Sequence, residues 1–289
     1  MNENIQFENN KELEAVILGL PEYQKKEVWI RGKDQTYEAE SHVAIIEKNS
    51  DSNPIAILSK KYKLIQHREA FIPFINMCRA MGINVKGTIT KSEGKVFLRA
   101  IFMDKRARVV VDGEELYTGV LLGNSVDGTM GLFMESFAFR SVCSNGMLLG
   151  KTLVARVYKI HAGNAEILKE QYQKFSEQII ENSPRLSDII KRAISENIQE
   201  SVINQALYGA GFGKNHVKKL LEKCQQLDIK NKWDLYNVIT NWLTHELEVK
   251  WGAEKWHQSN ATRLLTEPLS ILVENGAAIE KTIKEKKQV

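Results

Sequence analysis

Basic side chains gather between Tyr62 and Arg140, and aromatic residues stand among them. Cations follow a phosphate backbone and aromatic rings stack on unpaired bases, so this combination is typical of a site for single-stranded nucleic acid. The candidate phosphate-binding residues are Lys86, Lys91, Lys95, Arg99, Lys105, Arg106, Arg108 and Arg140. The candidate base-stacking residues are Tyr62, Phe97 and Phe102. A solvated sheet face above core aromatic residues would give the same pattern, because exposed lysines commonly serve only solubility.

The formal net charge of +4 is a small remainder of an uneven distribution. Residues 1–50 carry 6 basic and 10 acidic side chains, and residues 166–289 carry 18 and 17. Residues 51–165 carry 16 and 9, so the excess of +7 lies in the segment that holds the candidate site. The charge distribution therefore indicates where a polyanion would bind.

A nucleophile and base are also available, since Cys143 and His161 could act together with Asn145 to orient them. However, Cys143 follows an apolar strand, and free cysteine is among the most buried residue types. A hydrolase is therefore the last of the hypotheses, and we expect the protein not to be an enzyme.

Two further patterns fail as cofactor or metal sites. The run Gly209–Lys214 lacks the first glycine and the final hydroxyl residue of a phosphate-binding loop, so it is interpreted as a turn between helices. Asp127 could bind a divalent cation together with Glu135 or Asp104, but an Asp-Gly pair is more often turn chemistry. We expect no cofactor and no metal.

The periodicity predicts an α+β fold, with an antiparallel sheet and a packed helix followed by a helical C-terminal region. Residues 69–81 have the apolar spacing of an amphipathic helix, and further helices are expected up to a break at Ser183–Pro184, from Leu186 to Ile198 and over Thr262–Val273. The strands on either side of Gly94 are expected to form a hairpin. The predicted strands are Val43–Glu47, Ile55–Leu58, Tyr62–Ile65, Val85–Thr90, Val96–Met103, Leu116–Leu122 and Leu132–Val142. The turn formers of residues 49–54 mark a boundary, which gives an acidic N-terminal segment 1–54, a core domain 55–165 and a helical region 166–289.

The composition excludes several classes of protein. No apolar run approaches the ~18 residues of a bilayer span, so no membrane association is expected. The chain has three widely spaced cysteines and an N-terminus without the features of a signal peptide. These features favour a reducing, cytoplasmic location.

Three strings resemble motifs of the phage- and plasmid-borne family known as domain of unknown function 932. They are Gly123–Thr129, Phe139–Leu148 and Ile160–Asn164. The matching positions are Asn124, Asp127, Gly128, Arg140, Cys143, Asn145, His161, Gly163 and Asn164. Gly146 and Ala162 depart from the threonines usual in that family. The resemblance implies a protein of mobile DNA, and the order of elements is similar in topology to phage annealing proteins of the Erf, RecT and Red-beta type.

The leading hypothesis is a protein that binds single-stranded DNA in a basic groove and promotes strand annealing, as a ring or filament of identical subunits. Annealing needs no covalent catalysis, because strands held with exposed bases can sample complementary partners.

The alternative is a phage interaction protein that binds and inhibits a host defence enzyme. Tryptophans in the C-terminal half motivate it, because tryptophan is a typical interface anchor. They are Trp233, Trp242, Trp251 and Trp256.

Overall fold

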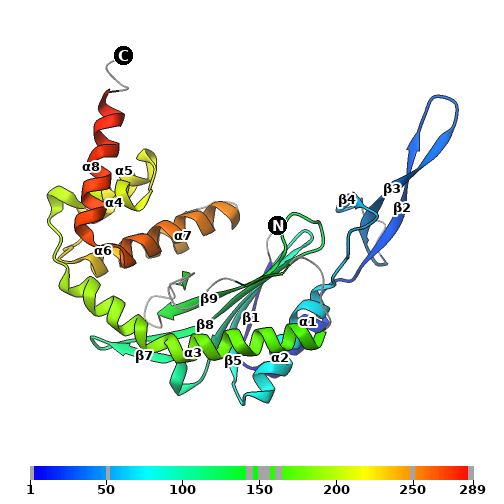
Figure 1. The fold of residues 1–289 in the computed structure, drawn as a ribbon, viewed down its shortest axis with the longest axis horizontal. Coiled ribbons are helices and arrows are strands. Elements are labelled where there is room, and N and C mark those ends of the chain that lie inside the picture. Colours follow the sequence, from blue (N-terminus) through cyan, green and yellow to red (C-terminus); the bar gives the residue numbers. More distant parts are fainter. Residues whose placement is uncertain are drawn as a thin grey trace. The chain divides into compact units, whose positions relative to one another are not determined.

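The structure is a computed structural model that describes residues 3–49, 53–140, 146–148, 157–159, 165–247 and 251–285 (Figure 1). The predicted α+β class is confirmed, with antiparallel strands followed by a helical C-terminal region. The chain forms two compact units. The first comprises Met1–Ala107, Gly119–Ser136 and Val154–Ile180, and the second comprises Arg108–Thr118, Phe137–Leu153 and Glu181–Val289. These units do not coincide with the three predicted segments, because residues 1–54 belong to the same unit as the core strands.

The main sheet has the strand order β1-β5-β6-β8-β9-β10, in which β7 also pairs with β8 and β11 with β9. The strands are β1 (Glu3–Phe7), β5 (Val85–Ser92), β6 (Lys95–Phe102), β7 (Arg108–Val111), β8 (Glu114–Ser125), β9 (Leu132–Arg140), β10 (Gly146–Leu148) and β11 (Val157–Lys159). The predicted hairpin is β5 and β6, and its turn places Gly94 at φ +66°. A positive φ of this size favours glycine, which explains the residue at this position.

One face of β5 and β6 forms the core of the first unit. Val85 lies opposite Phe102 and Ile89 opposite Leu98, and all four side chains are fully buried. Helix α1 (Asn10–Leu18), helix α2 (His67–Ala80) and the first part of α3 (Ala165–Ser195) provide further buried apolar residues of this unit. The Tyr172 hydroxyl of α3 donates to the Ala70 carbonyl of α2 at 2.9 Å, which fixes these two helices against each other.

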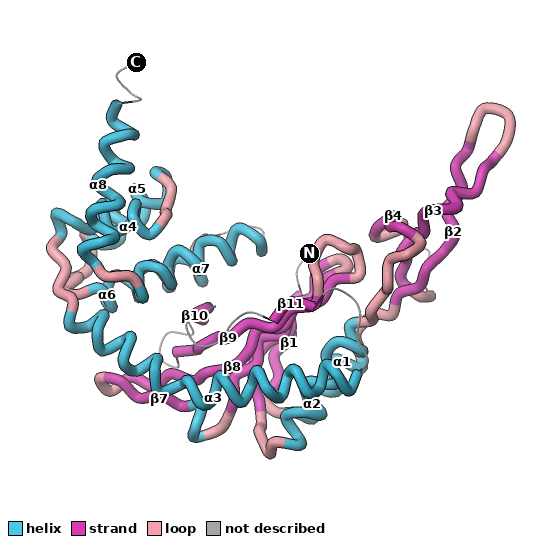
Figure 2. The backbone as a smooth tube through the Cα atoms, viewed as in Figure 1, coloured by secondary structure: helices cyan, strands magenta, loops and turns pink. Residues whose placement is uncertain are grey.

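A second, smaller sheet of the first unit has the order β2-β3-β4. Strands β2 (Tyr23–Arg31) and β3 (Thr36–Glu47) form a long ribbon, and β4 (Ala56–Ser59) pairs only with the inner part of β3 (Figure 2). The sequence predicted only Val43–Glu47 of this ribbon. The missed signal is the run of β-branched and aromatic residues around Trp29, which is followed by a turn at Gly32.

The second unit is mainly helical. Its helices after α3 are α4 (Glu200–Ala210), α5 (Lys214–Cys224), α6 (Lys232–His245), α7 (Trp251–Thr266) and α8 (Leu269–Glu285). The glycine run is a turn between α4 and α5, as predicted, with Gly211 at φ +103° as the C-cap of α4. Helices α4 and α8 approach so closely that a Cβ on Gly276 would lie 1.8 Å from the Gln205 carbonyl oxygen.

Three predictions of secondary structure were wrong. Tyr62–Ile65 forms no strand and is a loop between β4 and α2. Helix α3 continues through Pro184 where a break was expected, so tertiary packing outweighs the hydrogen bond that proline removes. The single helix expected over residues 262–273 is instead parts of two helices, because helical structure is interrupted at Pro268 between α7 and α8.

Candidate nucleic-acid interface

The second face of β1, β5 and β6 is polar. Side chains that lie opposite each other in paired strands share a face, and the register pairs Thr88 with both Gln6 and Arg99. This face, called the polar face, carries Asn4, Gln6, Lys86, Thr88, Thr90, Ser92, Lys95, Phe97, Arg99 and Ile101. These three described strands place no carboxylate on it. No role was predicted for the hydroxyl and amide side chains, although Thr88, Thr90 and Ser92 follow Lys86 at intervals of two residues, the spacing of one strand face.

Three of the predicted phosphate-binding residues, Lys86, Lys95 and Arg99, belong to the polar face, and all are partly exposed. Lys86 has no ion pair with any residue that the structure describes. Lys95 Nζ lies 3.3 Å from Asp127 Oδ2. A partly exposed ion pair of this kind contributes little free energy to stability. A phosphate can therefore compete with Asp127 for Lys95.

The other predicted cations are dispersed. Lys91 lies on the opposite face of β5, where its Nζ is 2.9 Å from Glu3 Oε2. Arg106 pairs with Asp104 at 2.6 Å, and this hydrogen-bonded pairing lowers the pKa of Asp104. Lys105 is exposed beside it in a short 3-10 turn, Lys105–Ala107.

Arg108 belongs to the second unit, where it begins β7 and pairs with Glu115 across to β8. The basic excess of residues 51–165 is thus partly neutralised by local carboxylates. Strand β9 ends at Arg140, whose side chain lies outside the described part of the chain.

Two of the three rings are not available for stacking. Phe102 is fully buried in the core, and Phe97 is 5% exposed, with its ring centroid 6.5 Å from that of Phe133. The prediction that these two rings stack on bases was therefore wrong, because both pack within the first unit. Tyr62 is half-buried, its hydroxyl lies 3.4 Å from the Ser125 carbonyl oxygen, and burial raises its pKa to about 12.

The first motif string contains the end of β8 and the start of the loop that connects β8 to β9, and this loop packs against the smaller sheet. Asp127 Oδ1 accepts hydrogen bonds from the Thr129 amide at 3.0 Å and from its hydroxyl at 2.7 Å. Gly128 has φ +71° and lies against Leu58 of β4. Val126 is fully buried in a cluster with Tyr23, Val43 and Ile45. Asp127 and Gly128 therefore have a structural role in this loop.

Asn124 precedes this loop and contacts a buried histidine, His67, which no sequence motif had indicated. Asn124 Nδ2 lies 3.0 Å from His67 Nδ1, and both side chains are fully buried. Burial lowers the pKa of His67 to about 4, although the charge of Asp127 opposes the shift. The histidine is neutral at pH 7 and shut off from solvent, so it contributes to packing and not to proton transfer.

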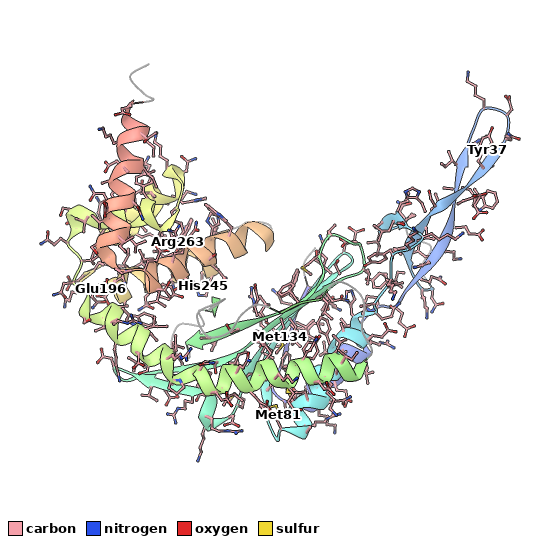
Figure 3. All side chains as sticks on the ribbon, viewed as in Figure 1. Tyr37, Met81, Met134, Glu196, His245 and Arg263 are labelled. Atoms are coloured by element: carbon pink, nitrogen blue, oxygen red, sulfur yellow. The ribbon has the colours of Figure 1, made fainter. Side chains whose placement is uncertain are left out.

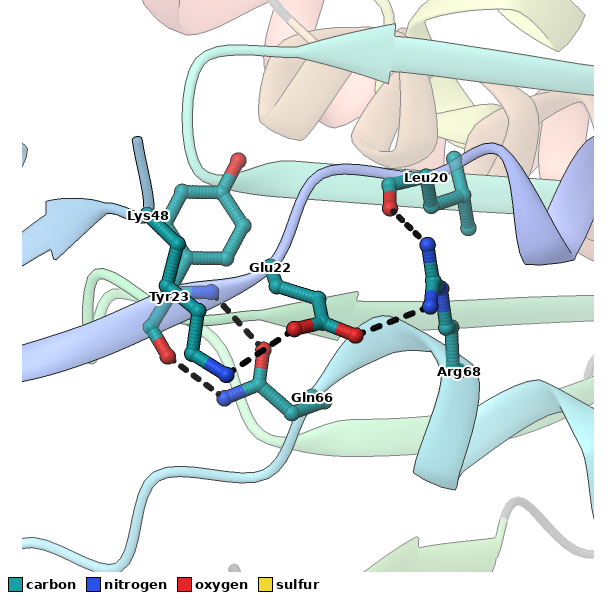
Figure 4. Close-up of polar contacts among 6 residues, drawn as sticks. All are labelled: Leu20, Glu22, Tyr23, Lys48, Gln66 and Arg68. Carbon is teal, nitrogen blue, oxygen red and sulfur yellow. Dashed lines mark hydrogen bonds and ion pairs between the residues drawn. The ribbon is translucent and has the colours of Figure 1, made fainter. Parts of the chain in front are cut away.

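A polar network holds the base of the ribbon to α2 (Figure 4). Glu22 pairs with Lys48 at 2.9 Å and with Arg68 at 2.8 Å. Gln66 accepts a hydrogen bond from the Tyr23 amide at 2.9 Å and donates one to its carbonyl oxygen at 2.8 Å. The hydrogen bond and charge of Lys48, together with the charge of Arg68, lower the pKa of Glu22.

The second unit contains a cluster of rings around two histidines. The ring centroids of His216 and His257 lie 4.4 Å apart, and Phe212 and Trp242 also contact this pair. Burial lowers the pKa of both histidines, and the charge of His216 contributes to the shift of His257. Trp233 and Trp242 are buried, whereas Trp256 is 51% exposed. The side chain of Trp251 lies outside the described part.

The candidate residues Cys143, Asn145, His161, Gly163 and Asn164 lie outside the described residues, so the geometry of a nucleophile and base is not described. Among the residues that are described, no three His, Cys, Asp or Glu side chains gather in a metal-binding arrangement. No helix in the described ranges is long and apolar enough to cross a bilayer.

Comparison with known proteins gives one match. Residues 54–265 match the model of the family described as "Domain of unknown function (DUF932)". The chain has no significant match among curated proteins or among solved structures.

Proposed function

Since the chain belongs to the DUF932 family, whose description assigns no activity, we propose a function from the geometry: the protein binds single-stranded DNA and promotes annealing of complementary strands. The proposal includes assembly of identical subunits into a ring or filament. It also includes action in the cytoplasm on phage or plasmid DNA, which the sequence resemblance favours.

The observation that carries the proposal is the composition of the polar face. Cations, hydroxyls and amides from three adjacent strands lie together there, and all these groups can donate hydrogen bonds to phosphate oxygens. The three strands themselves place no carboxylate on the face, and the Asp127 carboxylate beside it is paired with Lys95, so repulsion of a polyanion is small. Because Phe97 and Phe102 are buried, the interaction is with the DNA backbone and is independent of base sequence.

A second candidate function is binding and inhibition of a host enzyme. Trp256 on α7 favours it, because an exposed tryptophan is a typical anchor in protein interfaces. Trp233 and Trp242 do not support it, since their rings are part of the helical core.

The test measures binding of a labelled oligonucleotide by fluorescence anisotropy over a range of salt concentrations. We expect Lys86→Glu to weaken binding and to reduce the slope of log affinity against log salt by about 0.7, the value for one phosphate contact on a single strand. Lys11→Glu is the matched control. Lys11 is an exposed cation on α1, away from the polar face, and its substitution makes the same change of charge. The proposal would be contradicted by an affinity that does not change with salt concentration, or by an equal loss of affinity in the two variants.

A strand-annealing assay with two complementary oligonucleotides separates annealing from simple binding. We expect the wild-type protein to accelerate duplex formation and Lys86→Glu to accelerate it less. Binding without acceleration would limit the function to single-strand binding.

A further inference from the structure

The outer part of the β2–β3 ribbon has no cover in the structure. Every residue from Gln24 to His42, here called the ribbon arm, is exposed or only partly buried. Trp29, Ile30 and Tyr37 are 57%, 58% and 51% exposed. Figure 3, in which Tyr37 is labelled, shows the side chains of the arm extending to both sides of its two strands.

An arm of this kind is not expected to be an ordinary solvent-exposed hairpin. Strand β4 pairs with His42–Ile45 only, so no third strand supports the arm beyond that point. Two strands alone are marginally stable in water. Large apolar side chains gathered on an exposed element typically mark an interaction surface. The arm therefore has the properties of a docking element.

The charges of the arm identify the chemistry of its partner. Residues 24–42 contain four basic and four acidic side chains, interspersed along both strands. A surface for nucleic acid would carry a basic excess, which the arm lacks. In a two-fold contact the same surface meets itself, and it must be complementary to itself. Equal numbers of both charges meet the charge requirement for such a contact, and the exposed apolar residues supply surface that it can bury.

We infer that the ribbon arm is a self-association surface that packs against the same arm of a second copy of this chain. Trp29 lies opposite Glu38 in the ribbon and Ile30 lies opposite Tyr37, so apolar side chains occur on both sides of its outer end. Packing of two arms removes these side chains from water and brings Arg31 and Lys33 of each copy to the acidic side chains of the other. This inference rests on the proposed assembly of identical subunits, in which the two-fold arm contact joins subunits in pairs and a ring or filament needs a further contact, and it is independent of DNA binding.

Reversed charges on the full-length chain test the inference. One variant carries Arg31→Glu and Lys33→Glu, which leaves two basic and six acidic residues in the arm. The other carries Asp34→Lys and Glu40→Lys, which leaves six and two. Self-association is measured by sedimentation velocity and light scattering without nucleic acid. All four positions are exposed, so circular dichroism should show unchanged folding.

We expect the wild type to self-associate and each variant alone to associate at least about tenfold more weakly. An equimolar mixture of the two variants should recover association, because their arms then carry opposite charge. Trp256→Ala, an exposed tryptophan outside the arm, should leave association unchanged.

Three results would overturn the inference. They are a monomeric wild type, association that neither variant weakens, and weakened association that the mixture does not recover. Anisotropy with a labelled oligonucleotide is measured on the same samples. A wild type that associates without binding DNA contradicts only the proposed function, whereas variants that lose DNA binding with unchanged association assign the arm to nucleic acid and overturn the inference.

Discussion

At the scale of single residues, Asp127 connects the motif loop to the polar face. One of its oxygens holds Thr129 and the other pairs with Lys95. Burial alone would raise the pKa of Asp127, but the hydrogen bonds from Thr129 and Ser125 and the charge of Lys95 outweigh it and leave the pKa lowered. The carboxylate is therefore the form that the folded loop prefers.

We expect Asp127→Asn to lower the free energy of unfolding at pH 7 by about 1.5–3 kcal/mol, the range for hydrogen bonds to charged groups. A carboxyl group with a lowered folded pKa contributes stability above its unfolded pKa of about 3.9, and that contribution is lost as the pH falls through the folded pKa. The difference between wild type and variant should thus shrink below about pH 4. Urea denaturation at several pH values measures it.

Asp112→Asn is the control, because Asp112 is an exposed turn residue with φ +50° that asparagine also tolerates. A difference that stays constant from neutral to acid pH would show that the charge of Asp127 is unimportant and that only the shape of the loop matters.

At the scale of elements, helices α4 and α8 of the second unit cross in close contact at two glycines. A Cβ on Gly209 would lie 1.9 Å from the Leu272 carbonyl oxygen, and Gly276 has the equivalent contact with Gln205. Both obstacles are backbone atoms, which cannot rotate away. The two glycines therefore determine how closely these helices pack.

Gly276→Ala should destabilise the protein by about 1–3 kcal/mol or more, the cost of overpacking, even though alanine is the better helix former by about 1 kcal/mol. Gly213→Ala is the matched control, because no atom lies within 4 Å of a Cβ placed there. Thermal unfolding followed by circular dichroism gives the comparison. Equal melting temperatures for the two variants would show that α4 and α8 do not require this close approach.

At the scale of the whole molecule, both units contain fully or partly buried histidines that prefer the neutral form. Burial lowers the pKa of His67 to about 4 in the first unit, and burial lowers the pKa of His216 and His257 in the second. The unfolded chain binds protons on these rings at about pH 6.5, before the folded protein does. Acid therefore favours the unfolded state of both units.

We expect the free energy of unfolding to decrease as the pH falls from about 6.5 towards 4, with His67 alone contributing up to about 3 kcal/mol at 1.36 kcal/mol per pKa unit. Guanidinium denaturation at fixed pH values measures the trend. Proton NMR of the histidine rings checks its origin, since the His67 resonance should not titrate between pH 7 and 5. Titration of His67 with an ordinary pKa in the folded protein would refute this account.

Local patterns were sufficient for helix α2, the hairpin of β5 and β6 and the turn after α4. The apolar spacing of residues 69–81 and the glycine at position 94 depend only on neighbours in the chain. The ribbon of β2 and β3 was missed because both of its faces are exposed, so it lacks the apolar alternation that marks a half-buried strand. The prediction that α3 ends at Pro184 was wrong, because tertiary packing outweighed the local preference of proline to end a helix.

The sequence by itself determined the α+β class, the family and the segment in which positive charge accumulates, since all three depend on residue types and their order. Only the tertiary structure decided which of those charges share a surface. Lys95 and Arg99 of β6 share one face with Lys86 of β5, because the register between the two strands places their side chains on the same side of the sheet. The same packing buried Phe97 and Phe102, since a ring contacts solvent or core according to what distant segments place against it.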